Sequence, residues 1–286
     1  MNCIQRIKLY TGALTICSML SLVTTGAVIA QHWQPVRAQK TPEQVYIWSH
    51  NDYEQDLPLF KALSLGVQMI EADIHLIDNK LYVAHDHPSD LLNTPVLEEM
   101  YLTPLSNWID DQGGVVHPDS DLDFFLVIDV KTDAEATYEA ILDEIEPYRK
   151  LFFRLEDREW VDGPVKLLIS GNRPQINPET NNRIAFIDGR IRDSGYGLDT
   201  RLYPIISDHW FTWFSWDGDG QMPEEERQRL HTLVAQVQQE GKLIRFWATP
   251  DKKTVWDELM KANIDIINVD DLKGMTNYLN SRAGEN

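Results

Sequence analysis

The sequence has few cysteines and few basic residues, and each shortage excludes a class of protein. Cysteine occurs only at Cys3 and Cys17, close to the N-terminus. A disulfide framework in the rest of the chain is therefore excluded, and burial of apolar side chains has to stabilise the fold. Lys and Arg number 26 against 45 Asp and Glu, a formal net charge of −19. Nucleic-acid backbones and anionic membrane surfaces are bound through clustered cations, so this charge argues against either as a partner.

Residues 1–30 have the pattern of an export signal. Arg6 and Lys8 precede an uncharged, largely apolar stretch over residues 9–30, which ends in small residues at Ala27 and Ala30. This pattern predicts a signal peptide cleaved after Ala30, or a membrane anchor if the segment is retained. We therefore expect an exported protein, periplasmic, extracellular or at the cell surface, or one anchored in a membrane.

From Thr41 onward, short apolar runs alternate with helical patterns, and no Gly/Ser-rich or Pro-rich linker divides them. This organisation predicts one domain over residues 41–284. The predicted strands are residues 45–48, 69–75, 81–85, 124–131, 165–170, 184–188, 204–208, 243–247 and 264–270. Alternation of strand and helix indicates a parallel sheet, and about eight units favour a closed (β/α)8 TIM-type barrel. Nine runs exceed eight, so either 81–85 or 204–208 is expected to be a hairpin arm or an irregular strand.

Helix boundaries are visible at three places. Pro58 opens a pattern that Gly66 closes, Asp133 opens a second, and Pro223 opens a third that ends at Gly241. Proline in the first turn, a capping aspartate and a glycine after the last turn are the usual start and stop signals.

Polar residues recur on one face of the predicted strands. Side chains alternate between faces, so Ile70, Ala72 and Ile74 face the helices while Glu71, Asp73 and His75 share the opposite face. The other strands that end in polar residues on this face do so at Asp129 with Lys131, Asp188 with Arg190, Arg245 with Trp247, and Asn268 with Asp270. Burying such groups unpaired costs several kcal/mol each, so they indicate a solvated functional end. In a barrel this is the C-terminal end of the strands, where active sites lie.

Three of these carboxylates suit a metal ion. Glu71 and Asp73 project from neighbouring inward positions, and Asp129 supplies a third oxygen, a set typical of one Mg²⁺ or Ca²⁺ ion. His50 and His85 follow two of the strands and are the candidates for proton transfer, because imidazole titrates near neutral pH. A structural ion pair remains the alternative interpretation of Asp129 with Lys131.

Four motifs resemble a known superfamily. They are Ser49-His50-Asn51-Asp52-Tyr53, Glu71-Ala72-Asp73, Val83-Ala84-His85-Asp86 and Ile128-Asp129-Val130-Lys131. Their order and spacing resemble the phospholipase-C-like phosphodiesterases, in particular the glycerophosphodiester phosphodiesterase branch. With residues 245–250 and 268–271 included, the sequence is most similar to the "altered inheritance of mitochondria protein 6" group. Asn51 and Asp129 depart from the Arg and Glu usual in that branch, which leaves the leaving alcohol open.

The resemblance implies a phosphoric diester hydrolase acting on a glycerophosphodiester- or phospholipid-like substrate. It implies a metal on Glu71, Asp73 and Asp129, with Lys131 adding positive charge. His50 would accept a proton and His85 would protonate the leaving alcohol, with Asp86 or Asp270 orienting them. The substrate contacts would come from Asn51, Arg245 and Trp247. A metal-free version of this chemistry uses Arg or Lys in place of the ion, but three clustered carboxylates favour the metal.

Two further segments each have more than one interpretation. The aromatic residues of 208–216 form a lid, a substrate wall, a membrane-interface patch through Trp210, Trp213 and Trp216, or part of the core. Residues 215–226 match a calcium-binding EF-hand loop except for Ser215 at the first ligand position. The alternative is an acidic helix N-terminus.

Two rival functions remain open. A glycoside hydrolase needs only two carboxylates and tryptophan platforms, but it leaves both histidines unexplained. A secreted barrel that binds a ligand or lipid without catalysis is the other. No internal repeat is visible, and the oligomeric state is not indicated.

Overall fold

The computed structural model describes residues 44–195 and 197–283. The predicted export signal over residues 1–30 and both cysteines lie outside the described residues. Among the helices that are described, none combines the length and apolar character needed to cross a bilayer.

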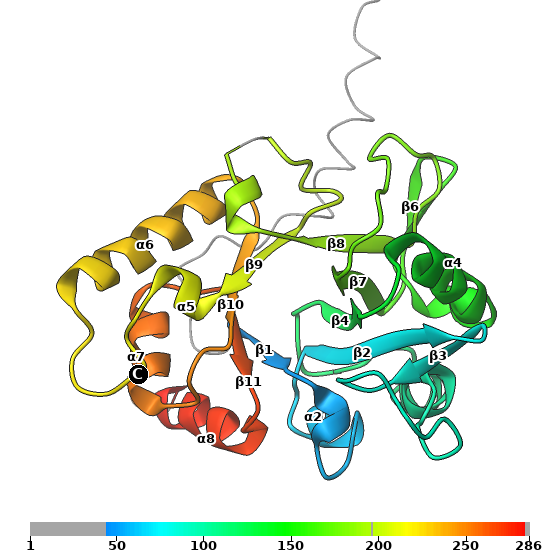
Figure 1. The fold of residues 1–286 in the computed structure, drawn as a ribbon, viewed down its shortest axis with the longest axis horizontal. Helices are drawn as coiled ribbons and strands as arrows, with labels where there is room; N and C mark the ends of the chain where they lie inside the picture. The colour runs from blue at the N-terminus through cyan, green and yellow to red at the C-terminus, as the bar shows by residue number, and fades with distance from the viewer. Residues whose placement is uncertain (1–43, 196, 284–286) are drawn as a thin grey trace, which may run out of the picture. The chain divides into compact units, whose positions relative to one another are not determined.

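Eight parallel strands of the described chain close into a barrel, which confirms the predicted TIM-type fold (Figure 1). They are β1 (Tyr46–Ser49), β2 (Met69–Ile77), β4 (Phe124–Val130), β7 (Val165–Gly171), β8 (Ala185–Gly189), β9 (Ile205–His209), β10 (Leu243–Trp247) and β11 (Ile266–Val269). β1 closes the ring because it pairs with β2 on one side and β11 on the other. β3 (Lys80–Val83) instead runs antiparallel to β2, so the surplus run is the hairpin arm near 81–85.

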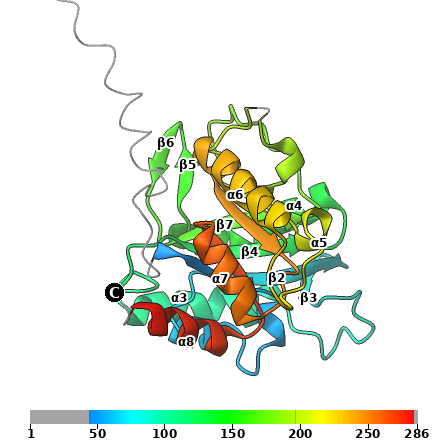
Figure 2. The ribbon, with the colours of Figure 1, turned by 90° about the vertical axis from the view of Figure 1, so that its left-hand side faces the viewer.

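The helices lie outside the ring of strands, as Figures 1 and 2 show. They are α2 (Phe60–Ser64), α3 (Thr103–Asp111), α4 (Ala134–Ile145), α5 (Trp210–Trp213), α6 (Glu224–Gln239), α7 (Lys253–Lys261) and α8 (Leu272–Ala283). The short 3-10 helices are η2 (Asp52–Glu54), η4 (Glu146–Leu151) and η5 (Ile191–Asp193), and η3 (Glu98–Leu102) is a π-helix. The predicted boundaries are confirmed where they have a physical signal: the Asp133 side chain accepts from Ala136 N at 3.0 Å, and Gly66 follows α2 with a φ of +71°.

Strand side chains divide into two sets with period two. In β2, Ile70, Ala72 and Ile74 are buried in the core between the barrel and its helices. Met69 starts the opposite set, which is apolar near the N-terminal ends of the strands and becomes charged at Glu71 and beyond. The predicted polar inner face is therefore confirmed, and the strands carry it toward their C-terminal ends.

A small hairpin was not predicted. β5 (Arg154–Glu156) and β6 (Glu159–Val161) pair through a turn at Asp157 and Arg158, both with positive φ. Gly or Asn normally marks such a turn, so the sequence carries no signal for it.

The aromatic segment is mainly core. Trp210, Phe214 and Trp216 are buried, and Trp210 Nε1 donates to the carbonyl of Trp216 at 2.8 Å. The predicted membrane contact is wrong for Trp210 and Trp216, since buried rings cannot reach a bilayer. Trp213 is half-buried against the same core, and Phe211 alone is strongly exposed.

The loop at 215–226 uses its glutamate internally. Glu226 accepts hydrogen bonds from Ser215 N, Ser215 Oγ and Trp216 N at 2.6–3.1 Å. These bonds occupy the carboxylate that an EF-hand would offer to calcium. The acidic helix N-terminus is the interpretation that the structure supports.

Candidate active site

Three carboxylates meet inside the C-terminal end of the barrel. Asp73 of β2 stands opposite Asp129 of β4 in the strand pairing, and Glu71 lies two residues before Asp73 on the same face. One oxygen from each lies within 4.8 Å of the others, and no other group of three such side chains converges in the described residues. The sequence therefore folds into an oxygen-rich site of the kind that hard divalent cations bind.

The two carboxylate oxygens of Asp73 have different surroundings. Oδ2 accepts from Tyr53 Oη at 3.0 Å, and it lies 2.9 Å from both His85 Nδ1 and Lys131 Nζ. Oδ1 is buried and has no hydrogen-bond partner in the described part of the chain. Because a buried oxygen without a partner is costly, Oδ1 is a ready ligand position, and the residues present fit a cation.

The space for the Asp129 carboxylate depends on a neighbouring glycine. Gly171 has a φ of +65°, and a Cβ there would lie 2.4 Å from Asp129 Oδ1. Only glycine therefore leaves room for this carboxylate. Burial and then the negative charge of Glu71 raise the pKa of Asp129, although Lys131 lies 2.9 Å away. A cation bound between Glu71 and Asp129 would relieve the repulsion between the two carboxylates.

Two buried side chains hold the Glu71 carboxylate in place. Its Oε2 accepts from Trp48 Nε1 at 2.6 Å and from an Arg245 guanidinium nitrogen at 3.3 Å. Arg245 lies 3.6 Å over the Trp48 ring and donates to Asn268 Oδ1. Since only 3% of Arg245 is exposed, the predicted substrate contact is corrected: the guanidinium lies behind Glu71, away from the surface that a substrate reaches.

Both predicted histidines bind a carboxylate through Nδ1. His50 lies 2.8 Å from Asp270 Oδ1, and His85 lies 2.9 Å from Asp73 Oδ2. Asp270 is thus the partner of His50. Asp86 is exposed, and Asp73 orients His85 in its place. This pairing leaves Nε2 of each ring available to a ligand.

The pKa of His50 is raised. Burial alone lowers it, but the hydrogen bond that His50 donates to Asp270 and the negative charge of Glu71 outweigh burial. The side chain is 28% exposed, so solvent still reaches the ring. His50 is therefore a stronger base than a free imidazole and is active only above its raised pKa.

The remaining predicted site residues also lie at this end of the barrel. Asn51 follows His50 in a left-handed conformation with a φ of 44° and is buried. Trp247 ends β10, half-buried, with its ring centroid 4.4 Å from that of His209. Sequence reasoning assigned no role to Trp48, Tyr53 or His209. Trp48 could have been found from its position two residues before His50, because period two places both on the inner face.

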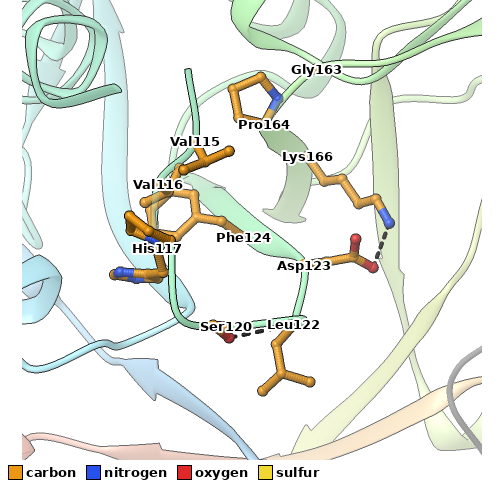
Figure 3. Close-up of a pocket in the computed structure, with 11 residues that line it drawn as sticks. Val115, Val116, His117, Ser120, Leu122, Asp123, Phe124, Gly163, Pro164 and Lys166 are labelled. Carbon is orange, nitrogen blue, oxygen red and sulfur yellow. Dashed lines mark hydrogen bonds and ion pairs between the residues drawn. The ribbon is translucent and has the colours of Figure 1, made fainter. Parts of the chain in front are cut away.

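A second hollow lies at the opposite end of the barrel (Figure 3). It has a volume of about 250 Å³ and is formed near the start of β4 and β7. At its edge Lys166 Nζ lies 2.5 Å from Asp123, and burial lowers the pKa of this lysine. Asp129 is near the C-terminal end of β4 whereas Phe124 begins it, so this hollow is separate from the carboxylates.

Similar proteins are known. The curated "Altered inheritance of mitochondria protein 6 homolog" of Arthroderma benhamiae is 24% identical over 316 aligned residues, covering 90% of this chain and 99% of the relative. The "Altered inheritance of mitochondria protein 6" of Eremothecium gossypii is 24% identical over 272 residues, covering 83% of this chain and 70% of the relative.

A solved glycerophosphodiester phosphodiesterase from Parabacteroides distasonis has the same fold, with a TM-score of 0.52 and 14% identity over 84% of this chain and 98% of that one. Residues 36–188, more than half of the sequence, match the model of the AIM6-like phosphodiesterase domain. The chain therefore belongs to the AIM6-like phosphodiesterase family, and its barrel is of the phospholipase-C-like type.

Proposed function

We propose that this protein hydrolyses a glycerophosphodiester- or phospholipid-like diester with one divalent cation, Mg²⁺ or Ca²⁺, and two histidines. The observation that carries the proposal is the meeting of Glu71, Asp73 and Asp129 around an unpartnered Asp73 oxygen, with His50 and His85 beside them. Family membership supports phosphodiester chemistry, and the residues supply the mechanism.

The metal would be held by Glu71, Asp73 and Asp129. A divalent cation bound there would supply positive charge to the phosphate and would stabilise the negative charge that builds in the transition state. Arg245 and Trp48 keep the Glu71 carboxylate in place through their hydrogen bonds to Oε2. We assign Arg245 this positioning role.

His50 acts as the general base. Its Nδ1 is held by Asp270, so Nε2 faces the attacking water or hydroxyl in the neutral ring. The raised pKa makes the transferred proton more stable on the imidazole. Asp270 stabilises the imidazolium that forms.

His85 acts as the general acid. Asp73 fixes its Nδ1, which leaves Nε2 to protonate the leaving alcohol, and the ring is 56% exposed, as a proton donor to a substrate requires. Lys131 contributes positive charge from between Asp73 and Asp129. Asn51 and Trp247 line the same end of the barrel and are the proposed substrate contacts.

Turnover of bis(p-nitrophenyl) phosphate by protein starting at Gln31 tests the proposal, in EDTA and with added Mg²⁺ or Ca²⁺. We expect activity that EDTA removes and that His50→Ala and Glu71→Gln abolish. The matched controls are His231→Ala and Glu225→Gln, which change exposed residues of α6 and should keep full activity.

Equal inertness of all five proteins with every metal would refute the proposal. It would favour the non-catalytic binding barrel. Hydrolysis of sugar-linked chromogenic substrates instead would favour the glycosidase.

We further propose that the protein is exported. The pattern of residues 1–30 supports this, and N-terminal sequencing of the mature protein tests it. A mature N-terminus at Gln31 is expected for a cleaved signal. An N-terminus at Met1 in a membrane fraction would mean a retained anchor, and one in the cytoplasm would contradict export.

A further inference from the structure

Arg190 directly follows β8 at the C-terminal end of the barrel. Its backbone is still extended, with a φ of −126° and a ψ of 152°, so the alternation of side chains continues past the end of the strand. Ile187 packs into the core between the barrel and its helices, which places Asp188 and Arg190 on the inner face. Arg190 therefore lies at the same end and on the same face as the three carboxylates of the candidate active site.

A single nitrogen makes all the hydrogen bonds of the Arg190 side chain. Nη1 donates to the Asp188 carboxylate and to the Gly189 carbonyl, both at 2.9 Å, and to the Asp188 carbonyl at 3.3 Å. In the described residues, Nε and Nη2 have no hydrogen-bond partner, and the side chain is 18% exposed. Because a guanidinium is rigid and planar, holding Nη1 fixes the direction of the N–H groups on Nε and Nη2.

Three basic side chains lie on the inner strand face near the carboxylates, and they differ in what they can bind. Lys131 Nζ already lies 2.9 Å from both Asp73 and Asp129. Arg245 is 3% exposed, and its guanidinium donates to side chains behind the site. Within the described chain, Arg190 is the one of the three that combines solvent exposure with unpartnered guanidinium nitrogens.

Arg190 lies within electrostatic reach of the metal-binding carboxylates. Burial lowers its pKa, but the charge and hydrogen bond of Asp188 and the charge of Asp129 outweigh burial and raise it. Asp188, Arg190 and Asp129 all influence the pKa of the buried Arg245 as well. The Asp188 carboxylate also accepts from Ser170, which stands opposite Asp129 in the strand pairing. Arg190 and Asp129 therefore belong to one group of charges, although they form no ion pair with each other in the described residues.

The unpartnered donors of Arg190 suit a phosphodiester. A phosphodiester shares one negative charge between two non-bridging oxygens, and the three carboxylates alone would repel it. Arg binds phosphate oxygens through short, charge-assisted hydrogen bonds from a planar edge, which the single nitrogen of lysine does not provide. A phosphate at this end of the barrel would therefore find a directed donor edge on Arg190 in addition to the proposed metal.

We propose that Arg190 binds a non-bridging oxygen of the substrate phosphate through Nε and Nη2, and that Asp188 positions Arg190 for this contact. The inference rests on the proposed function for the identity of the substrate. It assigns the phosphate to Arg190 and leaves the alcohol to Asn51 and Trp247. Binding of a phosphate ester is measurable without turnover, so the two proposals can fail separately.

Two ligands that differ by one charge test the contact. Diphenyl phosphate is an anion, and methyl diphenyl phosphate is a neutral triester with the same two aryl groups. Calorimetry with Mg²⁺ or Ca²⁺, on His50→Ala protein that the proposed function makes inactive, should show tighter binding of diphenyl phosphate. Adding Arg190→Gln should raise the Kd of diphenyl phosphate about tenfold, the usual worth of a hydrogen bond to a charged group, and leave that of the neutral ester within about twofold.

The matched control is Arg192→Gln, which removes an exposed arginine two residues along the chain and should leave both Kd values unchanged. Arg190→Gln also removes the ion pair of the buried Asp188, so this variant is expected to be less stable. Arg190→Lys keeps a positive charge beside Asp188 and should fold, but it lacks the second donor edge, so the Kd of diphenyl phosphate should still rise. Equal weakening of both ligands, or a Kd of diphenyl phosphate that neither substitution changes, would overturn the proposal.

Hydrolysis of bis(p-nitrophenyl) phosphate by protein that retains His50 keeps the two proposals apart. If both are correct, Arg190→Gln should raise KM for this diester. If the parent hydrolyses the diester and Arg190→Gln changes neither KM nor the binding of diphenyl phosphate, the proposed function stands and the assignment of Arg190 fails. If no protein hydrolyses it but Arg190→Gln weakens diphenyl phosphate alone, Arg190 binds the phosphate and the proposed catalysis fails.

Discussion

Each end of the barrel holds a lysine, half-buried Lys131 at the C-terminal end and buried Lys166 at the N-terminal end, and the two lysines differ in their surroundings. Lys131, at the C-terminal end, lies 2.9 Å from both Asp73 and Asp129. Lys166, at the N-terminal end, lies 2.5 Å from Asp123, and the negative charge of Asp162 also acts on it. Burial lowers both pKa values. Asp129 and Asp73 outweigh burial and raise the pKa of Lys131, whereas Asp123 and Asp162 do not outweigh it for Lys166.

This difference separates function from stability. Around Lys166 the neighbours are aromatic: its Nζ lies 5.8 Å from the Phe125 ring centroid and 5.2 Å from that of Phe153. Around Lys131 the neighbours are carboxylates, with the pKa of Asp129 still raised. The C-terminal end therefore brings together carboxylates whose mutual repulsion a divalent cation would relieve, and the described residues show no such cluster at the N-terminal end.

The largest expected effect is on turnover. His50→Ala and His85→Ala should each lower kcat by about 10²–10⁴-fold, the usual contribution of a positioned acid or base. Lys166→Met should leave kcat within about twofold of the parent, because its side chain is at the far end of the barrel. Steady-state kinetics on the same diester checks all three. Comparable losses in all three variants would show that the two ends are not separate.

The second effect is on stability. Lys131→Met should lower the free energy of unfolding by about 3–5 kcal/mol in EDTA, because it leaves two carboxylates uncompensated. The loss should shrink as pH falls toward the raised pKa of Asp129, since protonation replaces the missing charge. Lys166→Met should cost less, because Asp123 is 45% exposed and regains water. Urea unfolding at several pH values measures this, and an equal cost for both would contradict the comparison.

Metal binding should raise the free energy of unfolding only through the carboxylates at the C-terminal end of the barrel. Mg²⁺ or Ca²⁺ at 100 times its Kd should add about 2.7 kcal/mol to the free energy of unfolding. The effect should weaken as pH falls through the raised pKa of Asp129, because the protonated carboxyl is a poor ligand. Thermal unfolding with and without metal checks this. Glu71→Gln should abolish the shift and Glu225→Gln should keep it. A shift that survives Glu71→Gln would place the ion elsewhere.

The smallest expected effect is a displaced pH profile. Asp270→Asn removes the negative charge that helps to raise the pKa of His50 and leaves a weaker, neutral hydrogen bond, so the acidic limb of kcat/KM should move to lower pH. Because the base becomes weaker, kcat at neutral pH should fall as well. A pH–rate profile against the exposed control Asp271→Asn measures this. An unmoved acidic limb would mean that another group controls it.

Much of the fold and part of the site could be predicted from sequence, for identifiable reasons. Period two in the strands placed Glu71, Asp73 and Asp129 on one face, and the structure brings them together. Periodicity does not predict which residues of one strand face are enclosed and which reach solvent. Arg245 and Trp247 share a strand face, yet the first is enclosed beneath Glu71 while the second reaches the surface.

Tertiary packing also decided between the alternatives that the sequence left open. Trp210 and Trp216 resemble a surface patch in sequence, but their hydrogen bond and ring contacts place them in the core. The carboxylate partner of His85 is Asp73, which is 12 residues away in the sequence, and not the adjacent Asp86. A tertiary contact determines this pairing. Local sequence specifies which residues are inward, and tertiary packing specifies which of them meet.

The most direct test is a crystal structure of the protein grown with Mn²⁺, with anomalous scattering used to locate the ion. The account predicts one ion bound by Glu71, Asp73 and Asp129, with Asp73 Oδ1 as a ligand. Absence of an anomalous peak there at saturating Mn²⁺, with Lys131 still bonded to both aspartates, would contradict it.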